Sequence, residues 1–190
     1  MTIYDKVNEV VSPVYQVGGS VRDKLLGLEP KDYDFATPLS PEEVENAIKK
    51  VGKKCYAIGT KFGTLGMKID GELVEITTFR TEKYSFNSRK PRVRFVNDLS
   101  ADLGRRDFTI NAIAQQNDTL IDPYSGQFDI MSKTLKCVGD AKDRFKEDPL
   151  RMLRAGRFAS QLGFEIDQHL EATTKNLKLR FYNEKRINRS

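Results

Sequence analysis

The fold is decided by one stretch of the chain, Val14 to Thr37, which reads VYQVGGSVRDKLLGLEPKDYDFAT. Its pattern predicts a strand over residues 14–17, a turn at Gly18 and Gly19, a short helix, and a second strand around residues 32–36. A glycine turn that opens a helix presents unpaired backbone N–H groups and the positive end of a helix dipole. Both features favour an anionic phosphate.

Two carboxylates follow the glycine turn. Asp32 and Asp34 are two residues apart on a predicted strand, so their side chains point to the same face. Carboxylates crowded on one face repel each other, and both stay ionised when a cation lies between them. The stretch therefore predicts a phosphate site beside a divalent metal. The alternative is an exposed turn, which the preceding glycine pair makes the weaker interpretation.

The composition is that of a globular domain. The chain has 190 residues, of which 38% are hydrophobic, enough for one medium domain or for one domain with a smaller appendage. No apolar run is long enough to cross a bilayer, and the first residues do not resemble a secretory signal. We therefore expect a cytoplasmic protein with no membrane partner. Cys55 and Cys137 are expected to be isolated apolar side chains, and the single histidine, His169, excludes a histidine-rich metal site.

The net charge of +5 is concentrated in two stretches. Residues 80–106 contain eight basic and three acidic side chains, and residues 175–190 contain six basic and one acidic. Basic stretches around a more acidic centre suit a polyanion held against a metal site. Taken alone, each stretch reads as a solvated surface.

A third carboxylate is predicted on a hairpin. The dipeptide at residues 70–71 is Asp-Gly, a strong two-residue turn signal, and it joins strands predicted over 64–69 and 72–79. Alternation places Glu75 in a largely apolar row. A carboxylate there needs a partner, so Glu75 is a candidate to join the two aspartates. An ordinary exposed glutamate on a sheet edge is an equal alternative.

The remaining pattern changes character after Gly139. Before it, residues 81–97 lack periodicity and are interpreted as a mobile basic loop, and residues 105–112 are expected to open a helix. After it, the pattern is helical only. Asp148 and Pro149 begin a helix that runs to about residue 162 and carries arginines at three-residue steps.

Five blocks occur in a fixed order, and they read GGSVRD at 18–23, DYD at 32–34, EITTFR at 75–80, RRDFTINA at 105–112 and EDPLRMLRA at 147–155. Together they resemble the class II tRNA nucleotidyltransferases, which are the CCA-adding enzymes, and their relatives the bacterial poly(A) polymerases. The resemblance covers nearly the whole chain from about residue 14. It implies an α+β fold: a polymerase-β-like nucleotidyltransferase head of mixed sheet and helices over residues 1–139. An all-α neck that we expect to be incomplete would follow over residues 140–190.

The resemblance also implies roles for individual residues. It places the catalytic Mg²⁺ ions on Asp32 and Asp34, with Glu75 as the third carboxylate. The nucleotide-binding residues that it implies are Gly18, Gly19 and Arg22 for the triphosphate, Arg105 and Asp107 for the nucleotide and its ribose, Asp148 and Arg151 for the base, and Arg154 and Arg157 for further contacts.

The chemistry of the base-reading pair is consistent with this assignment. Cytosine and adenine both present an amino donor beside a ring-nitrogen acceptor, whereas uracil and guanine present a carbonyl beside an N–H donor. Asp148 can only accept hydrogen bonds when ionised, and Arg151 can only donate them. The pair therefore fits C and A and rejects U and G. The alternative is that the arginine row is a solvated helix face.

The activity that the resemblance implies is template-independent addition of C and/or A from CTP and ATP to the 3′ end of tRNA. A-adding, CC-adding and poly(A) activities are alternatives within the family, and the length of the basic loop favours CCA or CC addition. A catalytically silent RNA-binding head is the alternative outside it. Family enzymes continue into body and tail domains that grip the tRNA. Without such domains, residues 83–94 and 175–189 would bind more of the RNA, helped by self-association into a homo-oligomer.

Overall fold

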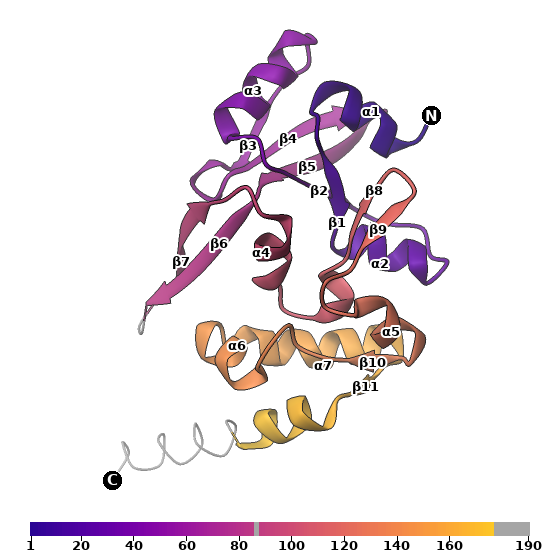
Figure 1. The fold of residues 1–190 in the computed structure, drawn as a ribbon, viewed down its shortest axis with the longest axis vertical. Helices are drawn as coiled ribbons and strands as arrows, with labels where there is room; N and C mark the ends of the chain where they lie inside the picture. Colours follow the sequence, from indigo (N-terminus) through magenta and orange to yellow (C-terminus); the bar gives the residue numbers. More distant parts are fainter. Residues whose placement is uncertain (86–87, 177–190) are drawn as a thin grey trace.

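A computed structural model describes residues 1–85 and 88–176 of the chain (Figure 1). A seven-stranded mixed sheet has the strand order β3-β4-β5-β2-β1-β8-β9. Its strands are β1 (Tyr15–Val17), β2 (Tyr33–Thr37), β3 (Tyr56–Gly59), β4 (Thr64–Ile69), β5 (Glu72–Thr78), β8 (Ala114–Gln116) and β9 (Thr119–Ile121). Strand β2 lies between β1, to which it is antiparallel, and β5, to which it is parallel.

One face of the sheet packs against helices α1 (Ile3–Val10) and α3 (Pro41–Lys50). Both helices begin at a capping box, formed by Thr2 with Asp5 and by Ser40 with Glu43. Alternate residues of the central strands, such as Phe35, bury their side chains between sheet and helices. The opposite alternates, including Asp34 and Glu75, therefore face the other side of the sheet, where α4 (Leu99–Gly104) packs over β1 and β2.

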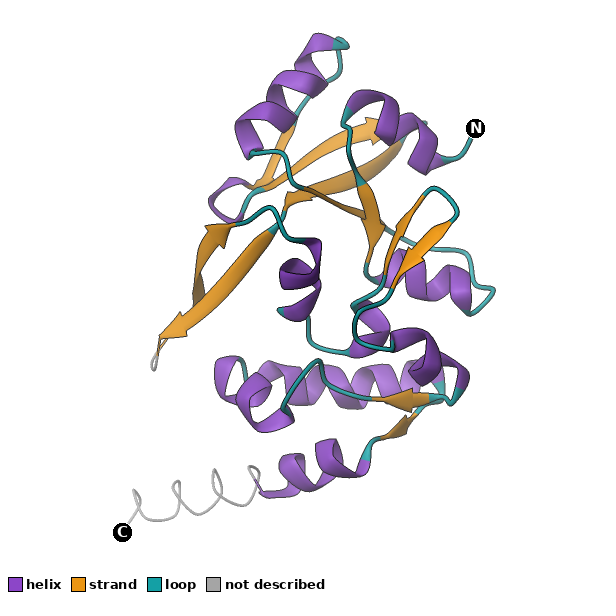
Figure 2. Cartoon of the chain, viewed as in Figure 1, coloured by secondary structure: helices purple, strands orange, loops and turns teal. Residues whose placement is uncertain are grey.

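A helical layer lies below the sheet (Figure 2). It contains α5 (Gly126–Met131), α6 (Ala141–Glu147) and α7 (Leu150–Leu162), and residues 168–176 are also helical. This layer shares a hydrophobic cluster with α2 (Gly19–Leu25) and with the 3₁₀ turn η2 (Thr109–Asn111). The cluster contains residues from both sides of residue 139, so the two predicted domains share a hydrophobic core. The domain boundary at residue 139 therefore stays a prediction.

The basic stretch was wrongly expected to be an irregular loop. It forms an antiparallel ribbon of β6 (Arg80–Ser85) and β7 (Ser88–Phe95), which extends away from the main sheet (Figure 1). Both faces of the ribbon carry charged side chains, so the sequence shows no apolar alternation. Pro91 lies inside β7, which is tolerated because the strand pairs on one side only.

The expected helix over residues 105–112 was also wrong. Phe108 bridges to Cys137 as an isolated β pair, and only η2 has helical geometry. Strand β10 (Thr134–Leu135) pairs in parallel with β11 (Glu165–Ile166). Strand β11 is a two-residue addition to the region expected to be all helical.

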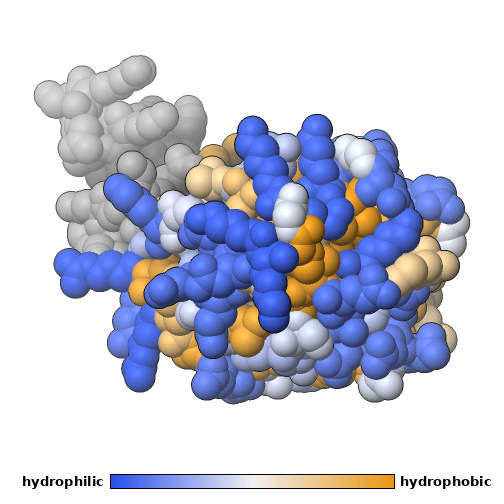
Figure 3. Space-filling model, turned by 90° about the horizontal axis from the view of Figure 1, so that it is seen from above, coloured by the Kyte–Doolittle hydropathy of each residue, from blue (hydrophilic) through white to orange (hydrophobic). Residues whose placement is uncertain are grey.

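The face of the molecule seen from above is mostly hydrophilic, and hydrophobic groups show between the hydrophilic side chains (Figure 3). Over the described ranges 1–85 and 88–176, none of the helices has the length and apolar character that crossing a bilayer requires. Both cysteines are free, and burial raises the pKa of the Cys137 thiol to about 12.

Candidate nucleotidyl-transfer site

One cavity of about 680 Å³ gathers every site residue that the sequence predicted. Twelve predicted residues, from the five blocks and from Arg157 just after the last of them, line it: Gly18, Gly19, Arg22, Asp32, Asp34, Glu75, Arg105, Asp107, Asp148, Arg151, Arg154 and Arg157. The sheet supplies the carboxylates and α7 supplies the arginine row. The cavity therefore lies where the sheet meets the helical layer.

The carboxylates lie at the centre of the sheet. Asp34 on β2 and Glu75 on β5 are direct register partners on adjacent parallel strands, and Asp32 immediately precedes β2. Burial raises the pKa of Asp34, an effect that Arg106 opposes and Asp32 reinforces. Burial also raises the pKa of Glu75, and both aspartates add to that shift. Asp34 and Glu75 are thus both harder to ionise in this position, as expected for acids that share a cation.

The donor set fits a divalent cation that also binds substrate. Among residues 1–85 and 88–176, no group of three or more His, Cys, Asp or Glu side chains could by itself hold a metal ion. Magnesium is commonly bound through one or two carboxylates together with substrate phosphates. Asp32 and Asp34, with Glu75 nearby, match a site in which the protein supplies some of the metal ligands and the substrate supplies the others.

The glycine turn lies against these acids. Gly18 has φ +72°, a left-handed conformation that favours glycine, and it precedes α2. A Cβ atom at Gly18 would lie 3.1 Å from Nη1 of Arg106 and 3.5 Å from Oδ2 of Asp34. The backbone conformation and the close approach of the Arg106 side chain therefore both favour glycine at this position.

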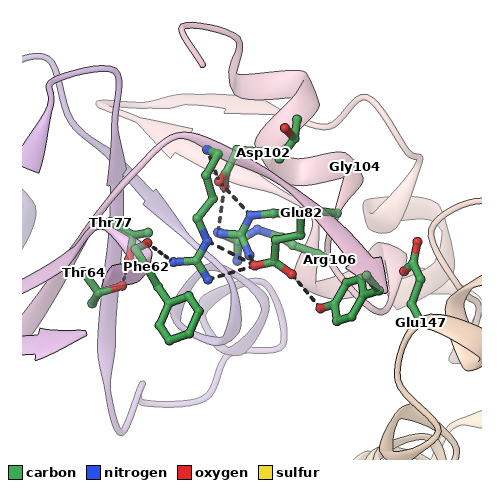
Figure 4. Close-up of polar contacts among 12 residues, drawn as sticks. Phe62, Thr64, Thr77, Glu82, Asp102, Gly104, Arg106 and Glu147 are labelled. Carbon is green, nitrogen blue, oxygen red and sulfur yellow. Dashed lines mark hydrogen bonds and ion pairs between the residues drawn. The ribbon is translucent and has the colours of Figure 1, made fainter. Parts of the chain in front are cut away.

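A buried ion-pair network supports one wall of the cavity (Figure 4). Glu82 on β6 accepts hydrogen bonds from Arg80 at 2.9 Å, from Arg105 at 3.0 Å and from the Tyr84 hydroxyl at 2.7 Å. Burial opposes ionisation of Glu82, but Arg105, Tyr84 and Arg80 outweigh it and lower its pKa. The network ties the β6–β7 ribbon to the segment that carries Arg105.

Asp102 completes this network from α4. Its side chain is 1% exposed, and it accepts from the backbone N–H of Arg80 at 3.1 Å and from Nε of Arg105 at 3.0 Å. It also pairs with Arg106 at 3.4 Å. The arginine expected to contact nucleotide, Arg105, is thus held in place by two acids.

Arg151 is held as firmly as Arg105. It is 7% exposed, its Nη1 donates to Oε2 of Glu147 at 2.6 Å and to the Arg144 carbonyl at 3.3 Å, and its Nη2 donates to the Arg105 carbonyl at 3.2 Å. The Tyr84 ring centroid lies 5.8 Å from its guanidinium carbon. These contacts use three of the five guanidinium donors. Asp148 lies beside it, where its Oδ1 accepts from the backbone N–H of Leu150 at 3.0 Å.

The other predicted arginines also have defined partners. Arg154 forms an ion pair with Asp107 at 2.6 Å, which joins two residues that the sequence predicted as separate nucleotide contacts. Arg22 donates to Asp23 at 2.9 Å and to Asn111 at 2.8 Å. Within the arginine row of α7, Arg151 and Arg154 thus have acidic partners, and Arg154 and Arg157 are also exposed.

Several cavity residues were missed by the sequence prediction. They are Val17, Phe35, Thr64, Thr77, Arg80, Glu82, Tyr84, Arg106, Asn111 and Phe158. Most of them lie within or just beside the recognised blocks, and that proximity was the signal available. Glu82 and Tyr84 lie in the stretch misread as a loop, where strand alternation would have placed them on one face.

Comparison with known proteins agrees with this geometry. The family described as the Poly A polymerase head domain matches residues 14–136. The chain belongs to that family. The match confirms the resemblance to class II tRNA nucleotidyltransferases and bacterial poly(A) polymerases, and it confirms the α+β head.

Named members of the poly(A) polymerase head family are close in sequence. The chain is 44% identical over 178 residues to the CCA-adding enzyme of Listeria innocua, covering 93% of this chain and 44% of that enzyme. It is 45% identical over 173 residues to the CCA-adding enzyme of Lactobacillus johnsonii, covering 90% of this chain and 42% of that enzyme. The chain thus spans less than half the length of these relatives.

Solved structures of the family share the fold. The Bacillus stearothermophilus CCA-adding enzyme in complex with CTP superposes with a TM-score of 0.80 at 38% identity, over 91% of this chain and 43% of that one. A tRNA nucleotidyltransferase complexed with a primer tRNA and an incoming ATP analog superposes with a TM-score of 0.73 at 32% identity, over 96% of this chain and 52% of that one.

Proposed function

We propose that this chain transfers C and A nucleotides from CTP and ATP to the 3′ end of tRNA, as a CCA-adding enzyme. The observation that carries the proposal is the gathering of all twelve predicted residues around one cavity. Supporting it, relatives more than 40% identical are CCA-adding enzymes, and one structural neighbour is a complex with CTP.

The reaction joins the RNA 3′ oxygen to the α-phosphorus of the nucleotide and releases pyrophosphate. The acidic set formed by Asp32, Asp34 and Glu75 would hold Mg²⁺, which when bound activates the attacking hydroxyl and neutralises charge on the pyrophosphate. The chain's own contribution is to position the substrate. Gly18, Gly19 and Arg22 hold the triphosphate near the carboxylates.

Base choice falls to the start of α7. An ionised Asp148 accepts from the amino group that cytosine and adenine share, and Arg151 donates to the adjacent ring nitrogen. Because the Arg151 guanidinium is fixed by Glu147 and by two carbonyls, its remaining donors have a defined direction. Uracil or guanine would set a carbonyl against Asp148 and an N–H against Arg151.

Incubation with Mg²⁺ and tRNA lacking its terminal CCA tests the proposal. CTP and ATP are supplied separately and together. We expect C addition with CTP and completion to CCA with both. Extension with ATP alone, with no use of CTP, would identify an A-adding or poly(A) activity. No extension with either nucleotide would favour the catalytically silent RNA-binding head. Action in the cytoplasm and self-association into a homo-oligomer remain predictions.

A further inference from the structure

Phe158 on α7 lies at the meeting point of three arginines. Its ring centroid is 5.2 Å from the guanidinium carbon of Arg22, 5.3 Å from that of Arg157 and 5.8 Å from that of Arg154. Each distance is within the range in which a guanidinium is attracted to the negative face of an aromatic ring. The three arginines come from α2 and α7, and all of them line the cavity with Phe158.

The ring itself is firmly placed. Phe158 is 9% exposed and belongs to the hydrophobic cluster beneath the cavity. Its ring meets that of Phe108 edge to face, at 5.7 Å and 78°, an arrangement favoured for aromatic pairs. Phe108 is fully buried. The Phe158 ring is therefore a rigid platform whose exposed part faces the nucleotide site.

The three arginines differ in what else holds them. Arg22 has Asp23 and Asn111 as partners, and Arg154 has Asp107. Within the described part of the chain, the partner of the Arg157 guanidinium is the Phe158 ring. Three like charges this close repel one another, and the ring is the element that touches all of them. Such a cluster suits a ligand with several negative charges, such as a triphosphate.

We propose that Phe158 is a positioning residue for the nucleotide triphosphate, because its ring gathers Arg22, Arg154 and Arg157 into one cluster at the cavity. The inference rests on the proposed function, since it assigns these arginines to the nucleotide. It adds a role for an apolar side chain that touches neither the reacting atoms nor the base. The Phe158 ring increases the affinity of the site for the phosphates and takes no part in the transfer step.

Binding of CTP and of pyrophosphate to the purified protein tests the role of the ring. Phe158→Leu keeps an apolar side chain but removes the ring. We expect its Kd for both ligands to rise roughly fivefold or more, as the loss of cation–π attraction implies. Its KM for CTP should rise in parallel, with kcat within about twofold of the wild-type value. Phe158→Tyr keeps the ring and should restore wild-type affinity.

Phe145→Leu is the matched control. Phe145 is a buried ring on α6 in the same hydrophobic cluster, and its replacement tests whether loss of packing alone weakens binding. Thermal melting of both leucine variants checks that each is folded. Wild-type affinity in Phe158→Leu, or an equal loss in Phe145→Leu, would overturn the inference.

A double-mutant cycle with Arg157→Gln tests the coupling directly. The effect of Phe158→Leu on Kd should be smaller in the Arg157→Gln background, because one of the gathered charges is already gone. Full additivity would contradict the inference. A wild-type protein that binds neither CTP nor pyrophosphate would overturn the proposed function and this inference together. Binding by the wild type and by Phe158→Leu alike would overturn the inference alone.

Discussion

Asp34 and Glu75 lie side by side on the parallel strands β2 and β5, as direct register partners. Their carboxylates face the same side of the sheet, and the pKa of each is raised by burial. Within residues 1–85 and 88–176, no cluster of His, Cys, Asp and Glu large enough to hold a metal by itself is present. Metal and nucleotide should therefore complete the site together.

Cooperative binding of metal and nucleotide is the first prediction. We expect Mn²⁺, used as a probe for Mg²⁺, to bind at least about tenfold more tightly when CTP is present, because the phosphates supply missing ligands. Electron paramagnetic resonance of free Mn²⁺ measures this, after correction for the Mn²⁺ bound by CTP alone. Equal affinity with and without CTP would contradict the shared site.

Gly18→Ala should impair nucleotide binding beyond its effect on folding. The backbone at Gly18, with φ +72° and ψ −138°, costs about 1–3 kcal/mol for a residue that has a side chain, and the new Cβ would lie 3.1 Å from Nη1 of Arg106, closer than ordinary contact. Gly27→Ala is a matched control, because Gly27 has φ +70° and nothing within 4 Å of the added Cβ. Both variants should melt at lower temperature, and only Gly18→Ala should lose CTP affinity. An equal loss of affinity in both would contradict the close approach.

Glu82→Gln should destabilise the fold in a pH-dependent manner. Burial is outweighed by Arg105, Tyr84 and Arg80, so the pKa of Glu82 is held below the ordinary value of a glutamate. A lowered carboxyl pKa contributes stability above the unfolded-state value, and that stability is lost as pH falls through the folded-state pKa. The variant should therefore lose about 2 kcal/mol at pH 7 and approach the wild type in acid.

Urea unfolding at several pH values measures this difference. Glu72→Gln, which changes an exposed glutamate on β5, controls for loss of charge and should stay near the wild type throughout. A difference between Glu82→Gln and wild type that is constant from pH 7 into acid would show that the ionised network does not stabilise the fold.

Arg151→Lys should weaken discrimination between bases more than it weakens nucleotide binding. Lysine keeps the charge but cannot span Glu147 and the carbonyls of Arg105 and Arg144 with one rigid fork. We expect the preference for CTP over UTP to fall by roughly 10-fold or more, the size of one well-formed base contact. The ratio of kcat/KM values for the two nucleotides measures it. An unchanged ratio would remove Arg151 from base reading.

The central strands and their carboxylates could be predicted from sequence because the signals are local. The Gly18 turn, the alternation through Asp32 and Asp34, and the hairpin at residues 70–71 each specify backbone geometry within a few residues. The structure confirms this hairpin, since β4 and β5 pair in antiparallel register around it. Glu75 lies opposite Asp34 because β5 pairs with β2. The spacing of these residues in the sequence does not predict that pairing, and the family resemblance is what suggested it.

Other features could not be predicted because their signal is not local. The β6–β7 ribbon carries charges on both faces, so it has no apolar period, and pairing across the ribbon is what reveals it. In the sequence, Asp102 resembles an ordinary surface acid of a short helix. In the structure it is buried, and it contacts the backbone N–H of Arg80 and the side chains of Arg105 and Arg106. Its role depends on the packing of α4 against the sheet. Helix α1, by contrast, begins at a capping box of Thr2 and Asp5, which is a local signal.

Transfer of labelled CMP from CTP to tRNA lacking its CCA end, by Asp34→Ala, is the most direct test of the central claim. Asp118→Ala, at an exposed position between β8 and β9, serves as the control, and thermal melting confirms that both variants are folded. We expect the wild type and Asp118→Ala to transfer CMP in Mg²⁺, and Asp34→Ala to transfer none. Undiminished transfer by a folded Asp34→Ala variant would contradict the assignment of this cavity as the nucleotidyl-transfer site.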